Sequence, residues 1–352
     1  MTQNQTHYQT HPYLQNRWAQ MERKLAFTNT TDAEIDHWRD RLTAKLKQLT
    51  GYDTMIPADP EPRQTEEIQF PGYVRQRIEI QTEPEVIMPF YALIPTSGKP
   101  PYPVIIATHG HGSGGKAAVV GDRADPAVSA AIDQYNYEYG VRFAQAGFIT
   151  FCPDARGFGE RQEAASQNDI LDSSCLALNN MAFPLGQTVT GMWTWDIHRL
   201  IDYIESREDC DSQRIGCAGL SGGGLQTLWA TALDSRIRSA IISGYLYGYK
   251  ESLLDLHMNC SCNYVPHLYE YVDMGDIAAL IAPRPLLVET GSRDPLNGAS
   301  GLANVESQME IIRRAYTLLD VEDRLRHVIF EGEHRWHGVD ATPWMAQHLM
   351  ND

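Results

Sequence analysis

The chain of 352 residues is long enough for one large α/β domain or two smaller ones. Its apolar fraction of 43% and aromatic fraction of 9% can supply a core, which excludes disorder as the default. Lysine and arginine total 29 against 45 aspartates and glutamates, so the net charge is −16. Such a surface repels nucleic acid, anionic membranes and polyanionic substrates, and it favours a small neutral or cationic partner.

The first residues and the cysteines indicate the cellular compartment in which we expect the protein. The first residues, MTQNQTHYQTHPYLQ, are polar and lack the apolar run of an export signal. No stretch reaches the roughly 18 apolar residues that span a membrane. Six cysteines occur without the spacing of a disulfide framework: Cys152, Cys175, Cys210, Cys217, Cys260 and Cys262. We therefore expect a cytoplasmic protein with reduced thiols.

Residues 1–65 are predicted to form a helical extension. Apolar residues recur there at spacings of three and four, which indicates helix over residues 13–50, beginning with Leu14, Trp18, Met21 and Leu25. Thr31 or Asp32 can cap a second helix start, with Glu34 in its first turn. We expect this extension to pack outside the main sheet or against another subunit, so it could support a homo-oligomer.

A linker at residues 57–64, PADPEPRQ, leads into a predicted catalytic domain at residues 66–352. The domain begins with VRQRIEI and MPFYALIP, which suit a hairpin of outer strands. Six segments that are apolar on both faces follow, as in buried parallel strands: PVIIATHG, FITFCPDA, RIGCAGLS, SAIISGY, PLLVETG and RHVIFEG. Helical stretches separate most of them, at 135–146, 190–206, 222–234, 301–319 and 342–350. The prediction is a doubly wound, mostly parallel eight-stranded α/β sheet with its chemistry at the C-terminal strand ends.

The sharpest local motif is RIGCAGLSGGGLQTLWA, in which Gly219 to Gly223 fit G-x-S-x-G between a strand and a helix. A turn this tight holds Ser221 in strained backbone geometry, and a Cβ at either flanking glycine would collide with a neighbouring strand or helix. The serine hydroxyl then stands at a helix N-terminus, where backbone N–H groups point outward. An idle serine in a glycine-rich turn is the weaker interpretation, because strand, turn and helix all appear in the required order.

A serine hydroxyl needs a base to become a nucleophile, and the base needs an orienting carboxylate. In this sheet architecture the chain order is serine, acid, histidine. Asp294 follows the strand PLLVETG at the expected catalytic edge, and its alternative role is to cap a turn before Pro295. Asp273 and Asp276 precede that strand and would lie at its other end, so they are the less favoured acids.

Two histidines follow the last strand in VIFEGEHRWHGVD. His334 is nearer the strand end, after the turn at Gly332, and we predict it as the base. His337 lies nearly a helical turn further on. An H-x-x-H metal pair is the other interpretation, and it lacks a clear third ligand nearby.

An oxyanion hole must offer two N–H donors to the developing negative charge. One donor is expected from Gly222, after the nucleophile, and the other from His111 in THGHGSGGK, the loop after the third predicted strand. This loop is not a phosphate-binding P-loop, because Ala117 rather than serine or threonine follows Lys116. In the next strand's loop, PDARGFGER, Asp154 and Arg156 are expected to pair and brace the site.

The least ordinary segment is LHMNCSCNYVPHLYEYVDM at residues 256–274, within a possible cap or pocket insertion at 245–275. A zinc site could use His257, Cys260, Cys262 and His267. The C-x-C spacing is unusual for zinc and unsuited to a disulfide. We favour a loop whose tyrosines, Tyr264, Tyr269 and Tyr271, shape a cap or an acyl pocket, and we expect no metal and no cofactor.

Together these motifs resemble the α/β-hydrolase superfamily over roughly residues 70–350. Within it the chain looks like the acetyl xylan esterase and dienelactone-hydrolase-like groups, through HGHGSGG, PDARGFGER, GLSGGG, DIAALIAPRPLLVETGSRDP and FEGEH. The resemblance implies hydrolysis of carboxylic esters through an acyl-enzyme, often of acetyl groups on sugars or small alcohols. Serine at the elbow argues against dienelactone hydrolysis, which uses cysteine, and excludes the dehalogenase variant, which uses aspartate.

The predicted function is therefore a cytoplasmic serine esterase for small esters, with Ser221, Asp294 and His334 as its triad. Substrate contacts are expected from four further residues: His109, Tyr264, Trp336 and His337. A peptidase or amidase of the same fold is one alternative, but the N-terminal extension is a poor candidate for the gating domain such enzymes usually carry. A non-catalytic binding protein that kept the hydrolase shell is the other alternative.

Overall fold

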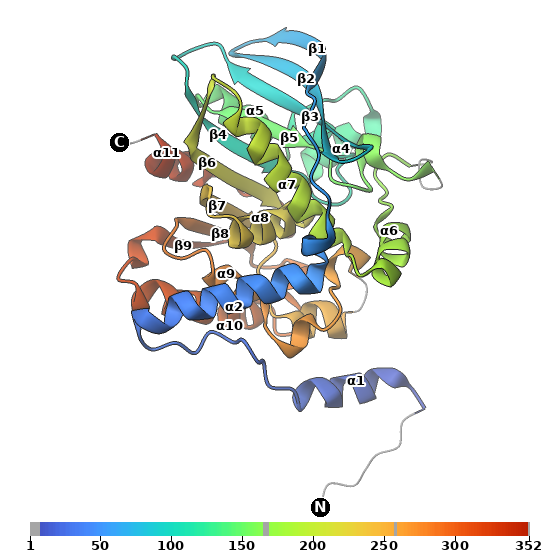
Figure 1. Cartoon of the computed structure of the whole chain (residues 1–352), viewed down its shortest axis with the longest axis vertical. Coiled ribbons are helices and arrows are strands. Elements are labelled where there is room, and N and C mark those ends of the chain that lie inside the picture. The colour runs from blue at the N-terminus through green and yellow to red at the C-terminus, as the bar shows by residue number, and fades with distance from the viewer. Residues whose placement is uncertain (1–7, 165–168, 257–258, 351–352) are drawn as a thin grey trace, which may run out of the picture.

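The computed structural model describes residues 8–164, 169–256 and 259–350. In these residues one nine-stranded sheet forms the centre, in the order β1-β2-β3-β5-β4-β6-β7-β8-β9 (Figure 1). The strands β1, β2, β3 and β5 pair antiparallel, and every pair from β5 across to β9 is parallel. Their bounds are Arg63–Phe70 (β1), Tyr73–Glu83 (β2), Val86–Pro95 (β3), Tyr102–Thr108 (β4), Ile149–Pro153 (β5), Cys210–Leu220 (β6), Ile237–Ser243 (β7), Leu286–Gly291 (β8) and Leu325–Phe330 (β9).

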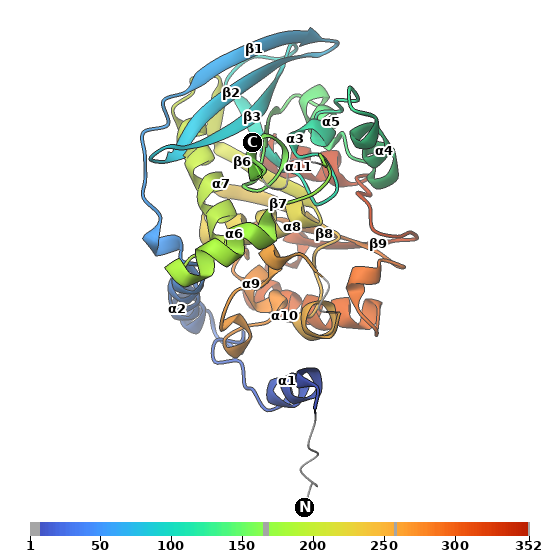
Figure 2. The same cartoon turned by 90° about the vertical axis from the view of Figure 1, so that its right-hand side faces the viewer.

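Helices cover both faces of the sheet (Figure 2). One apolar core joins α2, α7, α8, α9 and α10 to one face, and another joins α3, α4, α5 and α11 to the opposite face. The helix bounds are Thr10–Ala19 (α1), Asp32–Thr50 (α2), Lys116–Val119 (α3), Pro126–Tyr135 (α4), Tyr139–Gln145 (α5), Cys175–Ala182 (α6), Val189–Glu205 (α7), Gly222–Leu233 (α8), Met274–Ala279 (α9), Leu302–Leu318 (α10) and Ala341–Leu349 (α11). The predicted doubly wound, mostly parallel sheet is confirmed, with one strand more than the eight expected.

The additional strand is β1, which begins inside the segment predicted as a linker. Its sequence RQTEEIQF is almost wholly exposed, because it pairs only with β2 at the edge of the sheet. A strand with two solvated faces lacks the apolar alternation by which strands are recognised.

The N-terminal helix prediction is correct for two parts and wrong between them. Thr31 and Glu34 form the expected capping box, and α2 buries one side of its surface on the helical layer over the sheet. Residues 20–31 are not helical: the Leu25 N–H bonds to the Tyr271 carbonyl, and the chain runs along the segment after β7. Buried Leu25 and Phe27 alternate there as in an extended chain, so the helical spacing of Leu25 was coincidental.

The first helix, α1, projects away from the body in both cartoons (Figure 1). It contacts the remainder through Trp18, whose ring lies edge-on to Tyr269 at 4.5 Å. The side chains of Tyr13 and Leu14 are exposed. Association of subunits through this helix stays a prediction.

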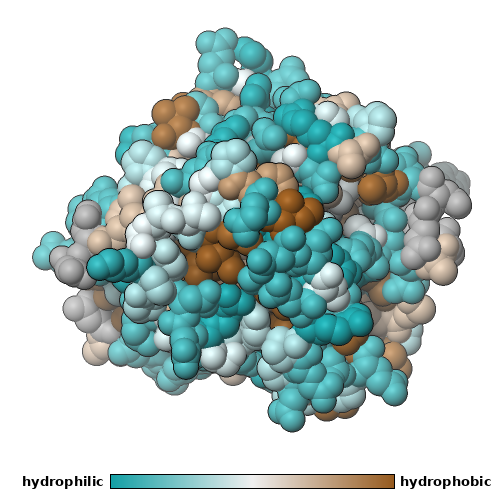
Figure 3. Space-filling view, turned by 90° about the horizontal axis from the view of Figure 1, so that it is seen from above, coloured by the Kyte–Doolittle hydropathy of each residue, from teal (hydrophilic) through white to brown (hydrophobic). Residues whose placement is uncertain are grey.

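The surface over the β1–β3 end of the molecule is largely hydrophilic, with apolar residues in small separate patches (Figure 3). Among the described residues, no helix is both long and apolar enough to cross a membrane.

Candidate active site

Ser221 lies in a strained turn between β6 and α8. Its φ of 59° and ψ of −118° fall where non-glycine residues are rare. An added Cβ on Gly219 would lie 2.3 Å from Thr108 Oγ1, and one on Gly223 would lie 2.2 Å from the Thr108 carbonyl oxygen. Both glycines are therefore required by close packing of β4 against the turn, as the motif predicted.

His334 and Asp294 meet at the same edge of the sheet. The Nδ1–H of His334 donates to Asp294 Oδ2 over 2.6 Å, and Asp294 is 5% exposed. The second carboxylate oxygen, Oδ1, accepts the Leu296 N–H over 2.9 Å. Asp294 thus caps the turn and orients the imidazole at once, so the two roles considered from the sequence are compatible.

The less favoured acids are committed elsewhere. Asp273 and Asp276 form a capping box at the N-terminus of α9. Asp276 also forms an ion pair with Arg23 at 2.7 Å. His337 is likewise engaged elsewhere, because its ring stacks on Phe330 with centroids 4.6 Å apart.

The loop after β4 closes over the nucleophile turn. An added Cβ on Gly110 would lie 3.1 Å from Ser221 Cβ, so the loop backbone passes close beside the serine. The His111 ring lies over Gly222, where an added Cβ would meet Nδ1 at 2.7 Å. The two predicted oxyanion donors are thus on segments in contact beside Ser221.

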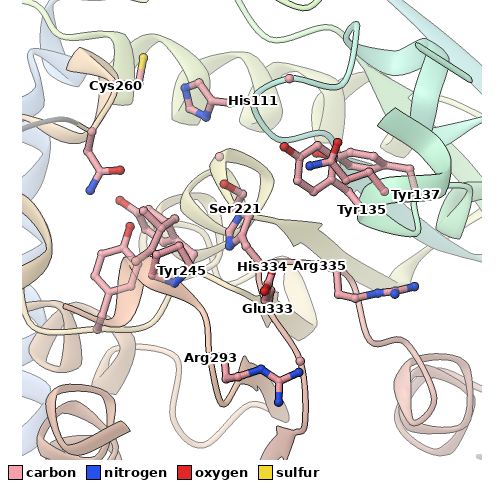
Figure 4. A pocket seen from close by; sticks show the side chains of 18 of the residues that line it. His111, Tyr135, Tyr137, Ser221, Tyr245, Cys260, Arg293, Glu333, His334 and Arg335 are labelled. Atoms are coloured by element: carbon pink, nitrogen blue, oxygen red, sulfur yellow. The ribbon is translucent and has the colours of Figure 1, made fainter. Parts of the chain in front are cut away.

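A cavity of about 830 Å³ opens over these residues (Figure 4). Ser221 and His334 lie at its centre, with His111 on one wall and tyrosines from two different segments on the sides. The lining residues are His111, Gly112, Gln134, Tyr135, Tyr137, Ser221, Gly222, Tyr245, Tyr247, Asn259, Cys260, Asn263, Arg293, Pro295, Leu296, Glu331, Gly332, Glu333, His334 and Arg335. The lining is polar and aromatic, which suits a ligand that carries hydroxyl groups.

Several of these lining residues were not predicted. Tyr245 and Tyr247 follow β7 directly, and a rule that inspects every residue after a parallel strand would have found them. Tyr135 is the last residue of α4 and Tyr137 lies two residues beyond it, and neither carries such a sequence signal.

The four predicted substrate contacts are not at the cavity wall, and we do not retain them. His109 is buried and accepts the Ala155 N–H at Nε2, and Trp336 is buried in a stack on Tyr139. Tyr264 donates to the Leu253 carbonyl and borders a different hollow, beside α1. His337 packs on Phe330, as described above.

The loop after β5 is braced by buried ion pairs, but with partners other than those predicted. Asp154 binds the Lys116 ammonium at 2.5 Å rather than Arg156. Arg156 instead makes two hydrogen bonds to Asp196 in α7, at 2.8 and 3.0 Å. Arg161 binds the same carboxylate at 2.7 Å. The tryptophans of α7, Trp193 and Trp195, are buried.

Glu289, in β8, is a buried carboxyl close to the site. Burial raises its pKa above the ordinary value, although the Gly338 N–H donates to Oε1 over 2.9 Å and favours the charged form. The folded state therefore holds this proton more tightly than the unfolded chain. The resulting stabilisation is fully present below the unfolded pKa and is lost as pH rises through the raised pKa.

Replacing Glu289 with glutamine should remove this pH dependence and keep an acceptor for Gly338. Relative to the wild type, the variant should gain stability from weakly acidic to weakly alkaline pH, by about 1.4 kcal/mol for each unit by which the pKa is raised. Urea unfolding at a series of pH values measures the change. Glu306→Gln is the control with the opposite sign, because Arg313 lowers the pKa of Glu306. Parallel curves for wild type and Glu289→Gln would contradict the prediction.

Many solved structures share this arrangement of helices and strands. A putative acetyl xylan esterase from Bacteroides fragilis NCTC 9343 superposes with a TM-score of 0.79 at 18% identity, over 94% of this chain and 84% of that chain. A glucuronoyl esterase from Solibacter usitatus gives 0.70 at 15% identity, over 95% and 100%. Acetyl xylan esterase 1 from Thermoanaerobacterium sp. JW/SL YS485 gives 0.60 at 18% identity, over 94% and 98%. At these identities the likeness establishes the fold, which is the predicted α/β-hydrolase fold.

Sequence comparison reaches the same group. The protein named "Putative hydrolase YtaP" of Bacillus subtilis (strain 168) is 28% identical over 233 residues, which cover 64% of this chain and 71% of that protein. Residues 2–341 match the Abhydrolase_7 family, described as an abhydrolase family, and this match spans nearly the whole chain. The chain therefore belongs to the Abhydrolase_7 family of α/β hydrolases.

Proposed function

We propose that this protein is a serine carboxylic-ester hydrolase that acts through an acyl-enzyme. The observation that carries the proposal is the 2.6 Å hydrogen bond between His334 and Asp294, in a cavity that His334 shares with Ser221. A strained serine, an imidazole and a buried carboxylate that orients it are the three components that nucleophilic acyl transfer requires.

In the proposed reaction, Ser221 Oγ attacks the ester carbonyl while His334 Nε2 accepts its proton. The N–H groups of Gly222 and His111 stabilise the negative charge on the carbonyl oxygen. Asp294 keeps the Nδ1–H tautomer and stabilises the imidazolium. His334 then protonates the leaving alcohol, and water, activated by the same imidazole, releases the acid and restores Ser221.

For the substrate we propose a small acetyl ester of a sugar or another polyol. Tyrosine, asparagine and glutamine side chains in the cavity offer hydrogen bonds to hydroxyl groups. The net charge of −16 disfavours polyanions. The names of the Bacteroides and Thermoanaerobacterium structures, acetyl xylan esterases, agree with an acetyl group on a carbohydrate. We keep the cytoplasm as the proposed location, where imported acetylated oligosaccharides fit better than polymeric xylan.

A fluorophosphonate probe and an ester panel test this proposal together. The probe should add its mass to the peptide that contains Ser221 in the wild type and in the remote control Ser206→Ala, and it should leave Ser221→Ala unlabelled. The panel compares acetyl, butyryl and longer esters of sugars and aryl alcohols with matched aminoacyl amides. Highest kcat/KM is expected for acetyl esters. Failure of the probe to label would favour the binding-protein alternative, and faster amide hydrolysis would favour the peptidase.

A further inference from the structure

One histidine and three cysteines meet beside the cavity. The ligand atoms of His111, Cys175, Cys260 and Cys262 all lie within 4.8 Å of one another. His111 Nε2 and Cys262 Sγ are 3.3 Å apart. These residues come from the loop after β4, from the first turn of α6 and from the segment after β7, so folding brings together three distant parts of the chain.

The distances suit a tetrahedral zinc ion. With Zn–S near 2.3 Å and Zn–N near 2.0–2.1 Å, the nitrogen and sulfur ligands of a tetrahedral zinc ion lie about 3.5–3.8 Å apart. One nitrogen and three sulfurs make a Cys₃His set, which is a known composition of structural zinc sites. All six cysteines are free thiols, and Cys175 and Cys262 are completely buried. We propose that His111, Cys175, Cys260 and Cys262 bind one Zn²⁺ ion.

The surroundings of the cluster hold these ligands in place. Asn263 Nδ2 donates to Cys262 Sγ over 3.6 Å, and the Ser173 hydroxyl lies 3.8 Å from Cys260 Sγ. Such donors support thiolate ligands from outside the coordination shell. The backbone between the two cysteines is fixed as well: Asn179 donates to the Ser261 carbonyl over 2.6 Å, and Thr190 donates to the Cys262 carbonyl over 2.5 Å.

The ligand set differs from the zinc site that the sequence suggested and did not favour. Cys260 and Cys262 are common to both sets. His267 is exposed and binds Glu270 at 2.8 Å, and His257 lies outside the described residues. His111 and Cys175 take their places. The expectation of no metal was based on the local spacing alone, and this cluster is our reason to replace it.

Four protein ligands close the coordination sphere, so the ion would act on structure and not on substrate. It would connect two walls of the cavity, because His111 and Cys260 both line it (Figure 4). Zinc on Nε2 would also fix the hydrogen of His111 on Nδ1, the atom that lies over Gly222. Neither the metal site nor this tautomer depends on the proposed esterase function.

Metal analysis of the full chain, purified without added metal or chelator, tests the site without reference to activity. About one zinc per chain is expected for the wild type. Cys262→Ser and Cys175→Ser should each retain less than about a tenth of that, because a serine hydroxyl does not replace a thiolate. Cys210→Ser is the matched control: Cys210 is also buried, at the start of β6, and should keep the full zinc content.

Two measurements on the wild type hold even where a ligand variant fails to fold. A strong chelator should lower the unfolding temperature and increase the number of thiols that react in the native protein. Cobalt loaded in place of zinc should give the intense visible absorption of a tetrahedral thiolate site. Protein free of zinc after growth in zinc-supplemented medium would overturn the proposal. So would four titratable thiols instead of six in the denatured, unreduced chain, since a disulfide would then occupy the cluster.

Discussion

Replacing His334 with alanine should lower kcat for an aryl acetate by about 10⁵- to 10⁶-fold, the scale of loss when a triad member is removed. His334 is the imidazole that Asp294 orients, at 2.6 Å, and it lies with Ser221 in the cavity. Without it Ser221 has no base, and only the oxyanion donors and substrate binding remain to promote the reaction. Steady-state kinetics at saturating ester measures the loss, with far-UV circular dichroism to verify folding.

His337→Ala is the matched control, three positions along the same loop. Its ring stacks on Phe330 and is not among the residues that line the cavity, so its loss should change kcat by less than about tenfold. If His337→Ala were inactive and His334→Ala active, the base would be misassigned. Similar large losses in both would indicate that the loop as a whole had been disturbed.

Asp196→Asn should destabilise the protein by about 3–5 kcal/mol, the cost of breaking a buried ion pair from one side. The carboxylate is 4% exposed and binds Arg156 and Arg161, which are themselves 11% and 7% exposed. Although burial raises its pKa, these two guanidinium groups hold the pKa of Asp196 below its ordinary value. An asparagine carries no charge, so both guanidinium groups would stay buried without the negative charge of Asp196. A loss of this size is a large part of the total stability of a typical domain.

Urea unfolding of wild type and variant measures this loss. Asp202→Asn is the control, because Asp202 lies in the same helix and binds Arg199 and Arg236 at a partly exposed position. Its loss should be within about 1 kcal/mol. The stabilisation by Asp196 should be present above the unfolded carboxyl pKa and fall as pH drops through the lowered folded value. Equal losses in the two variants would show that burial of the ion pair does not increase its contribution to the free energy of unfolding.

The central sheet was predictable because its signals are local. Strands buried on both faces are runs of apolar β-branched residues, and each of the six predicted parallel strands is present. Errors arose where a pattern had two interpretations. The exposed edge strand β1 was not predicted, and its first two residues fell in the segment interpreted as a linker. The spacing of Met21 and Leu25 looked helical although this part of the chain is extended.

In the candidate site, too, residues signalled by local sequence were predicted correctly, and residues placed by distant contacts were not. Ser221, Asp294 and His334 each follow a strand, so a rule about strand ends identifies them from the amino-acid sequence alone. The contacts of His109 and Trp336 could not be predicted in this way, because both are buried by side chains remote in sequence. The meeting of His111 with Cys175, Cys260 and Cys262 likewise depends on how three segments pack.

The extended stretch around Leu25 connects the N-terminal part of the chain to the α/β-hydrolase domain. The Leu25 N–H donates to the Tyr271 carbonyl, the Phe27 N–H donates to the Asp276 carboxylate, and α2 shares a core with α8. Residues 24–50 thus support the segment after β7, which carries Tyr245, Asn263, Cys260 and Cys262. Removing residues 24–50 would therefore expose apolar side chains of the core that α2 shares with α8. Substitutions in residues 24–50 would also act on the segment after β7, which contributes residues to the cavity.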